Sequence, residues 1–327
     1  MTSMPFTRTR TSLTLLCVLL AASACASGGV SSSSAASLLP GPKPAPFTGR
    51  DTALVGEYDS NSGVEFVIED AGKLYLLDTA HAAMKRTPLG PRGISDLVIK
   101  RRDVGPRAGS NQLQVHPVRP VAVIRKEALA ASPPAEPTPA AKSDLVELTS
   151  LDPTIKLEIR YATTNNFLGT RFYDEARAFM QRPAAEAVVR ANQKLRTLGY
   201  GLLIHDAYRP WYVTKMFWDA TPVDKHWLVA NPAEGSKHNR GAAVDLTLFD
   251  LATGKPVEMP STYDESTGRA YADYPGGTSL QRWHRALLRN AMVSEGFIVN
   301  PTEWWHFDFN GWKDYAIGNE PFDRIGR

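Results

Sequence analysis

Two short stretches near the C-terminus combine residue types that can bind a metal ion. His238 and Asp245 lie in the first stretch, and Glu303 and His306 lie in the second. Two imidazoles and one carboxylate are a ligand set typical of catalytic zinc, because they leave a fourth position for water. The remaining glutamate can act as an acid or base beside that position. These residues predict a zinc peptidase that holds one Zn²⁺ per chain on His238, Asp245 and His306.

The spacing of these residues indicates which elements must position them. Gly241 separates His238 from Asp245, so we expect His238 in a loop that enters a strand rather than on a shared helical face. Within residues 243–248 the apolar side chains alternate with Asp245, which places Asp245 on the cleft side of a strand. Glu303 and His306 have opposite parity on a straight strand. We therefore expect a bend between them, so that His306 can bind the metal while Glu303 reaches the bound water.

The surrounding elements are predicted from hydrophobic periodicity and from Pro and Gly at the ends of segments. Strands and helices alternate irregularly, and hairpin-like strands occur late in the chain. The fold class that fits is α+β with a central antiparallel sheet. We expect helices over 183–198, from 211 toward 219 and over 280–295, and strands over 155–161, 202–204, 243–248 and 297–299.

Overall composition excludes one class of partner. The chain has 327 residues and a formal net charge of +3, and its Lys and Arg residues are scattered along the sequence. A nucleic-acid-binding surface requires clustered positive charge. We therefore expect no nucleic acid partner.

The N-terminus has the pattern of an export signal. Two arginines precede an apolar run, 13–22, that is too short to span a membrane as a mature helix. Residues 20–25 resemble a bacterial lipobox, which predicts a lipoprotein signal over 1–25, a lipid anchor on Cys25 and location in the periplasm or cell envelope. A plain signal peptide with an incidental cysteine is the alternative. In the lipoprotein case no free cysteine remains, so a thiolate zinc site is excluded.

Low-complexity stretches divide the rest of the chain. Residues 26–46 are rich in Ser, Ala, Gly and Pro and predict a tether, and residues 128–143 predict a Pro/Ala-rich linker. Between them, 47–127 is expected to form a small all-β domain of unknown binding role. Its strongest signal is a hairpin around the turn at 70–72, and further strands are expected at 97–99, 113–115 and 121–124. The catalytic domain is expected over 144–327.

The two C-terminal motifs also carry a family resemblance. Ser-x-His-x-x-Gly-x-Ala-x-Asp at 236–245, followed by Glu-x-x-His at 303–306, is similar to the D-alanyl-D-alanine metallopeptidase family and most similar to its VanX/DdpX-type dipeptidases. The likeness extends from about Asp144 to the C-terminus and includes the segments 159–163 and 205–210. The resemblance implies hydrolysis of the D-Ala-D-Ala dipeptide into two D-alanines by a zinc-bound water that Glu303 activates.

The resemblance also implies roles for individual residues. His238, Asp245 and His306 correspond to the zinc ligands and Glu303 to the catalytic base. Arg209 corresponds to the arginine that stabilises the tetrahedral intermediate, Ser236 to a substrate-contacting serine and Asp264 to an aspartate that binds the substrate ammonium.

Two alternatives remain open at this stage. A D,D- or L,D-carboxypeptidase or endopeptidase would use the same zinc ligands on peptidoglycan stem peptides, but it would need an open groove. A non-catalytic cell-wall binding module would be expected to lack a ligand or the base, and this sequence has the full set. In each case we expect contact with the membrane only through the N-terminal lipid anchor.

Overall fold

The computed structural model describes residues 35–61, 63–78, 84–89, 100–102 and 114–326. The predicted signal segment 1–25, the strand expected at 97–99 and Leu113 lie outside the described residues. Gln114 and Val115, which we expected to continue a strand from Leu113, form no strand, and Val115 packs in the main core instead. Within these ranges, no helix is both long and apolar enough to cross a bilayer.

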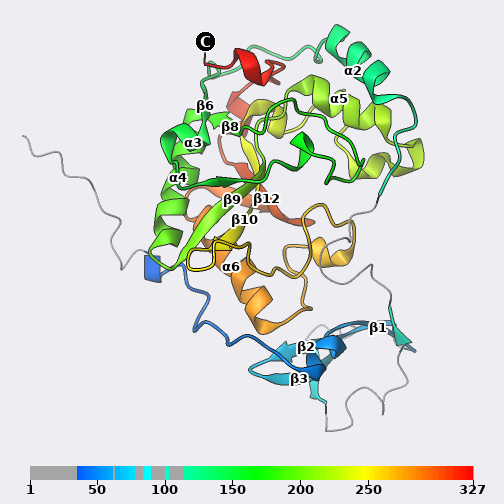
Figure 1. The fold of residues 1–327 in the computed structure, drawn as a ribbon, viewed down its shortest axis with the longest axis vertical. Helices are drawn as coiled ribbons and strands as arrows, with labels where there is room; N and C mark the ends of the chain where they lie inside the picture. The colour runs from blue at the N-terminus through cyan, green and yellow to red at the C-terminus, as the bar shows by residue number, and fades with distance from the viewer. Residues whose placement is uncertain (1–34, 62, 79–83, 90–99, 103–113, 327) are drawn as a thin grey trace, which may run out of the picture.

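Most of the described chain, residues 114–326 with the segment around Leu38, packs around one hydrophobic core and is called the larger body below. A mixed sheet forms its centre (Figure 1). Its described strands follow the order β11-β12-β10-β9-β7, and all neighbours are antiparallel except β7 and β9. The prediction of a largely antiparallel central sheet is therefore confirmed. The bounds are β7 Lys156–Leu157, β9 Tyr200–Asp206, β10 Ala243–Asp250, β11 Phe297–Asn300 and β12 Glu303–Phe309, and a separate pair is formed by β6 Leu145–Glu147 and β8 Phe179–Gln181.

Helices α4 (Arg182–Arg196) and α6 (Ser279–Val293) contact each other and the strands of this sheet. Pro183 lies in the first turn of α4, and the buried alanine and valine side chains of that helix recur at helical spacing. A capping box between Thr278 and Gln281 starts α6. Both helices agree with the predicted ranges to within two residues. The shorter helices are α3 Leu148–Leu151 and α5 Trp211–Ala220.

Residues 121–124 do not form the strand that we expected. They begin the helix α2, Val121–Ala130, which buries Ile124 and Ala128 and packs against α5. The apolar positions 121, 124 and 128 fit a helical period, and this pattern outweighs the local β-branched composition. The strand expected over 155–161 is also shorter, since only β7 pairs with the sheet and a 3-10 turn follows at Arg160–Ala162.

Two stretches predicted as a tether and a linker pack on the larger body where they are described. Leu38 is buried in its core, and the Asn290 and Trp283 side chains donate to the carbonyls of Leu38 and Gly41. Farther along the chain, Glu136 accepts a hydrogen bond from the backbone of Ile317 and pairs with Arg240.

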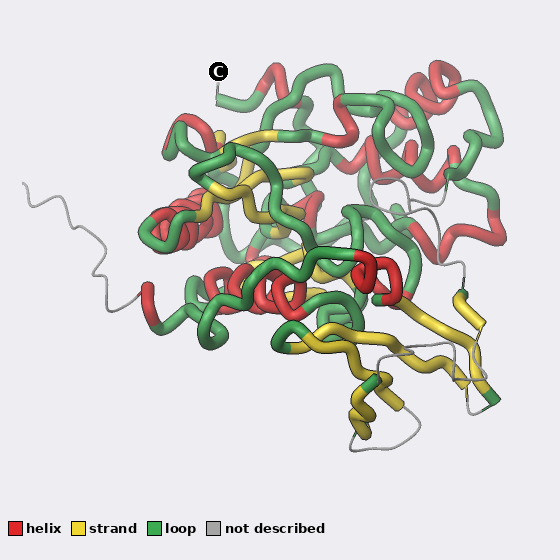
Figure 2. Tube along the Cα trace, turned by 60° about the horizontal axis from the view of Figure 1, so that its bottom comes forward, coloured by secondary structure: helices red, strands yellow, loops and turns green. Residues whose placement is uncertain are grey.

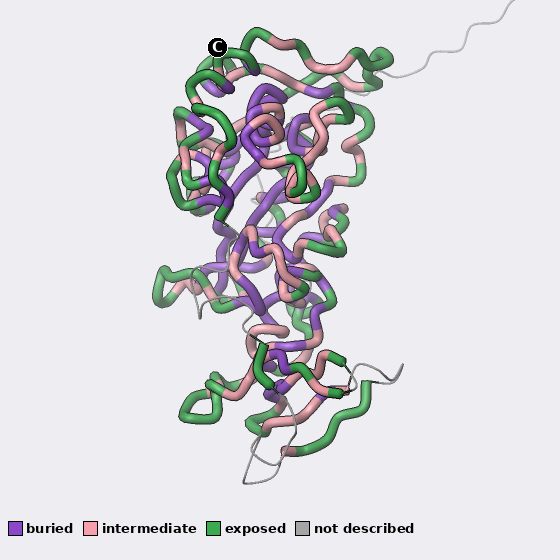
Figure 3. The backbone as a smooth tube through the Cα atoms, turned by 90° about the vertical axis from the view of Figure 1, so that its right-hand side faces the viewer, coloured by how far each residue is buried: buried purple, intermediate pink, exposed green. Residues whose placement is uncertain are grey.

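A second antiparallel sheet lies at one end of the molecule (Figure 2). Its strand order is β4-β3-β2-β1-β5, and its backbone is less buried than that of the larger body (Figure 3). Glu69 of this sheet is buried and accepts hydrogen bonds from the backbone and the hydroxyl of Ser279, at the start of α6. The bounds are β1 Gly56–Ser60, β2 Gly63–Asp70, β3 Lys73–Asp78, β4 Lys85–Pro88 and β5 Lys100–Arg101.

Candidate metal centre and active site

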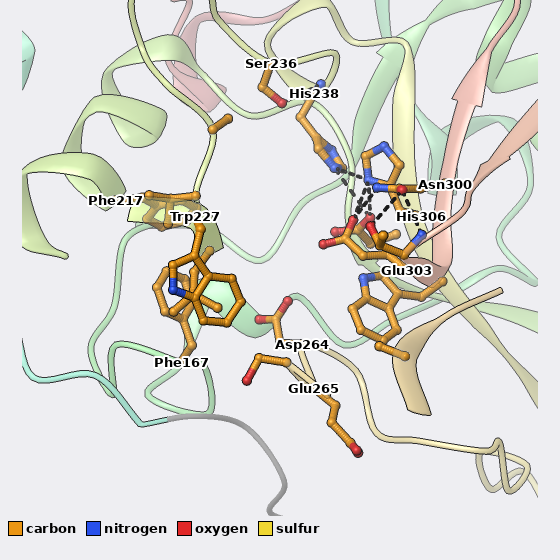
Figure 4. Close-up of a pocket in the computed structure, with 18 of the residues that line it drawn as sticks. Phe167, Phe217, Trp227, Ser236, His238, Asp264, Glu265, Asn300, Glu303 and His306 are labelled. Atoms are coloured by element: carbon orange, nitrogen blue, oxygen red, sulfur yellow. Dashed lines mark hydrogen bonds and ion pairs between the residues drawn. The ribbon is translucent and has the colours of Figure 1, made fainter. Parts of the chain in front are cut away.

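Three side chains from distant parts of the chain meet at one end of the central sheet. His238 lies in a 3-10 turn that ends at Gly241, whose φ of 66° is the left-handed conformation that glycine tolerates best. Asp245 lies on β10 and His306 on β12, and the two residues are paired neighbours in the sheet. Turn and strands together therefore place all three side chains in the lining of one pocket. Figure 4 shows His238 and His306 close to each other in that pocket.

The separations of the ligand atoms fit a tetrahedral metal. His306 Nδ1 lies 3.0 Å from Asp245 Oδ1, His238 Nε2 lies 3.1 Å from His306 Nδ1, and His238 Nε2 lies 3.4 Å from Asp245 Oδ1. Tetrahedral zinc with bonds of about 2.0–2.1 Å separates its ligand atoms by about 3.3–3.4 Å. Two imidazole nitrogens and a carboxylate oxygen are also donors that suit zinc better than magnesium or calcium. Charge and geometry both fit a divalent cation among them.

Outer hydrogen bonds fix which atom of each ligand faces the centre. His238 Nδ1 lies 2.7 Å from the carbonyl oxygen of Ala207, and His306 Nε2 lies 2.9 Å from Asp308 Oδ1. The Tyr263 hydroxyl donates to Asp245 Oδ2 at 2.9 Å, which turns Oδ1 toward the two imidazoles. Such contacts set the tautomer and orientation of metal ligands.

The charges of these groups are strongly coupled. Burial opposes ionisation of Asp245, yet the neighbouring His238 and His306 hold its pKa well below the ordinary range. Burial also lowers the pKa of His306, but hydrogen bonds to Asp245 and Asp308 outweigh that effect and raise it to about 10. The ligand set thus holds a proton in the absence of a cation.

Glu303 lies beside the three ligands, as the predicted bend requires. The pairing of β11 with β12 shifts between Val299 and Asn300, so that these adjacent residues pair with Phe307 and Glu303. This irregularity brings Glu303 Oε2 to 3.8 Å from His306 Nδ1, and the amide of Asn300 donates to the same oxygen at 2.8 Å. Desolvation raises the pKa of Glu303; the His306 charge opposes this shift and the Asp245 charge adds to it.

Arg209 reaches the same pocket from the segment after β9. Its Nε and Nη2 donate to Asp206 Oδ2 at 3.0 and 2.7 Å, and Asp206 Oδ1 accepts from the Tyr173 hydroxyl. The guanidinium lies over the rings of Tyr161 and Phe217. Arg209 is therefore a buried cation with a fixed orientation.

Asp264 and Ser236 line the pocket as well. Asp264 has φ 58°, an uncommon conformation for a residue other than glycine and one that functional loops often contain. Its carboxylate accepts from the Tyr161 hydroxyl at 3.1 Å. Burial, followed by the charges of Asp245 and Glu303, raises the pKa of Asp264 to about 8. Ser236 Oγ accepts a hydrogen bond from the backbone N–H of His238 at 3.2 Å, so the loop that carries His238 also positions the Ser236 hydroxyl.

Comparison with known proteins agrees with this geometry. A family model described as D-ala-D-ala dipeptidase matches residues 141–319, which is more than half of the chain. The chain belongs to this family of metallopeptidases. It is 32% identical over 180 residues to a D-alanyl-D-alanine dipeptidase of Escherichia coli K12, covering 55% of this chain and 92% of that protein. It is 31% identical over 186 residues to a D-alanyl-D-alanine dipeptidase of Enterococcus faecium, covering 51% and 88%. A Streptomyces coelicolor relative of the same name is 32% identical over 171 residues, covering 47% and 85%.

The structure brings together every residue that the sequence predicted for the site of this dipeptidase-family chain. It also shows supporting residues that we did not predict: Asp308 and Tyr263 orient ligands, Asp206 fixes Arg209, and Asn300 holds Glu303. Asn239 is a further example, since its buried amide donates to the carbonyl of Arg209. The position of Asp308 two residues beyond His306, on the same side of a strand, is a local signal that could have indicated such a role.

Proposed function

We propose that this chain is a zinc-dependent dipeptidase that hydrolyses D-Ala-D-Ala into two D-alanines. The observation that carries the proposal is the convergence of His238, Asp245 and His306, whose ligand atoms lie within 4.8 Å of one another, in the same pocket as Glu303. The names of the family and of the relatives support the choice of substrate.

The three ligands would hold the zinc ion through His238 Nε2, His306 Nδ1 and Asp245 Oδ1. When bound, zinc would supply Lewis-acid chemistry, lowering the pKa of a water molecule and polarising the scissile carbonyl. Glu303 then accepts a proton from the attacking water and returns it to the departing amine. Asn300 keeps the Glu303 carboxylate aimed into the pocket during this transfer.

Arg209 provides a positive charge for the substrate. Asp264 becomes the negative partner of a bound ammonium, because that ammonium counters the burial and the charges of Asp245 and Glu303 that raise the pKa of Asp264 to about 8. The carbonyl oxygen gains negative charge as the water attacks, and the fixed guanidinium of Arg209 stabilises that charge. Asp264 is the carboxylate that binds the free ammonium of a dipeptide, and it faces the same space as the metal ligands (Figure 4). Ser236 lies on the rim next to His238 and contacts the substrate backbone.

The stem-peptide alternative is supported by the size and rim of the pocket. Its volume of ≈ 580 Å³ lies in the range of pockets that hold drug-sized ligands, about 300–1,000 Å³, and such ligands are larger than a dipeptide of two alanines. Trp227 and Tyr271 line it and are 68% and 51% exposed. Asp264 favours the dipeptide, because a stem peptide has no ammonium at the corresponding nitrogen.

Release of D-alanine from purified protein distinguishes the two substrates. We expect free D-Ala-D-Ala to be cleaved at least about tenfold more efficiently than its N-acetyl derivative, the preference expected when a partly buried carboxylate loses its charged partner. The variant Asp264→Asn should lose most of that preference, whereas Asp273→Asn, at an exposed aspartate outside this pocket, should keep it. Faster cleavage of the acetylated peptide by the unmodified chain would assign the site to stem peptides.

We also propose that the chain is exported and anchored by a lipid on Cys25. The support is the lipobox-like segment 20–25 and the apolar run before it. Cys25→Ser should move the protein from the membrane fraction to the soluble fraction without changing its hydrolytic rate. Unchanged partitioning would refute the lipid anchor.

A further inference from the structure

A second cavity, distinct from the metal pocket, lies between the small sheet and α6. Its volume is ≈ 320 Å³, and both bodies contribute to its walls. Figure 1 shows β2 and β3 next to the end of α6. Three guanidinium groups line this cavity, from Arg86 on β4 and from Arg282 and Arg285 on α6.

Arg285 is a buried cation without a carboxylate partner in the described part of the chain. Its exposed fraction is 8%, and its hydrogen bond is a long one, 3.4 Å from Nη1 to the carbonyl of Tyr271. Nearby arginines differ in this respect, since Arg289 pairs with Asp273 at 2.9 Å and Arg86 pairs with Asp70 at 2.7 Å. A buried charge without a counter-charge is costly, so the position of Arg285 calls for an anion.

The neighbouring charges strengthen this requirement. Arg282 donates to the carbonyls of Gly277 and Glu69, and its nearest carboxylate oxygen, on Asp70, lies 3.8 Å away. Positions 282, 285 and 289 share one face of α6 and repel one another. Burial, together with the charges of Arg289 and Arg282, lowers the pKa of Arg285 to about 10, although Asp273 partly opposes this.

The remaining wall of the cavity is mainly apolar, and its carboxylate, on the exposed Asp273, is already paired with Arg289. Ile68 and Leu77 of the small sheet line it and are almost fully buried, and Pro275 lies opposite on the larger body. A strongly hydrated phosphate dianion gains nothing from such a wall, whereas an amphiphilic carboxylate matches both sides.

We propose that this cavity binds an organic carboxylate with an apolar group, of the size of an acylated amino acid. Its carboxylate pairs with Arg285, with Arg86 at the more exposed edge, and its apolar group packs against Ile68 and Leu77. The small sheet then completes a ligand site together with α6. A peptide C-terminus and a free acylated amino acid share this chemistry.

Calorimetric titration of the full chain with N-acetyl-D-leucine tests the proposal. We expect saturable binding, at least about tenfold weaker for N-acetyl-D-leucinamide, which lacks the carboxylate, and at least about tenfold weaker for Arg285→Met. Arg190→Met is the matched control, because that half-exposed arginine pairs with Glu295 away from the cavity. A longer peptide ending in D-leucine distinguishes the two sources, since equal binding indicates a peptide C-terminus and loss of binding indicates the free acylated amino acid.

Three further measurements keep the outcome decisive. Arg285→Lys retains a cation but loses the planar fork, so its binding should be at least about threefold weaker even if Arg285→Met does not fold. His306→Ala should bind the probe as tightly as the unmodified chain; loss of binding there would transfer the carboxylate to the metal pocket and overturn the proposal. Inorganic phosphate that binds as tightly as the probe, or an Arg285→Met chain that binds normally, would also overturn it. Failure of D-Ala-D-Ala hydrolysis would affect only the proposed function.

Discussion

Asp308 offers a sharp test of how the protein supports its metal ligands. One carboxylate oxygen of Asp308 lies 2.9 Å from His306 Nε2, and the other accepts a hydrogen bond from the Lys237 ammonium at 2.6 Å. Asp308→Asn keeps the shape but removes the negative charge that makes the His306 imidazole a stronger ligand. Loss of an outer carboxylate typically weakens metal binding about 10- to 100-fold, or about 1.4–2.7 kcal/mol.

The assay is competition for zinc with a chelator of known affinity at fixed pH. The control is Lys237→Met, which removes the other partner of Asp308 and leaves its charge facing His306; we expect less than about a threefold change in zinc affinity. With saturating zinc, Asp308→Asn should recover most of its hydrolysis. Unchanged zinc affinity in Asp308→Asn would show that the contact to His306 does not support the metal, and the reasoning would fail.

Three other expectations follow from the same geometry. Glu303→Gln should keep zinc but lose at least about a hundredfold in kcat, as removal of a general base does. Near-full turnover of a Glu303→Gln sample with normal zinc content would remove Glu303 from the mechanism. Arg209→Ala should lower mainly kcat in steady-state kinetics, whereas an effect confined to KM would assign Arg209 to ground-state binding. Zinc affinity should rise about tenfold per pH unit between pH 6 and 8. The reason is that the pKa of His306 without a cation is about 10, so zinc must displace a proton from the His306 imidazole. A zinc affinity that does not change with pH in chelator competition would contradict this.

The convergence of the candidate residues in one pocket could be predicted because most of them lie in short sequence motifs. His238, Asp245, Glu303 and His306 lie in two short motifs, and the parity argument for a bend between Glu303 and His306 agrees with the irregular pairing of β11 and β12. The supporting contacts could not be predicted in the same way. Tyr263 contacts Asp245, a residue far enough away in the sequence that only the fold brings the two together. Asp206 and Asn300 contact near neighbours, Arg209 and Glu303, but outside a helix that spacing alone does not predict a contact.

The fold was predicted best where periodicity was long. Helices α4 and α6 have extended apolar patterns and clear end signals, so their ranges agree with the structure. Val121–Ile124 is a short β-branched run, and its helical state depends on burial of Ile124 and Ala128 against α5, a tertiary contact. The packing of Leu38 on α6 is of the same kind, because composition alone gives no signal of a distant partner.

The most direct measurement is the zinc content of the purified chain together with its rate of D-Ala-D-Ala hydrolysis, in the unmodified protein and in His238→Ala, Asp245→Ala and His306→Ala. We predict one zinc per chain in the unmodified protein and parallel loss of zinc and activity in each variant. Full hydrolysis after complete removal of metal, or full zinc content in all three variants, would contradict the proposed centre.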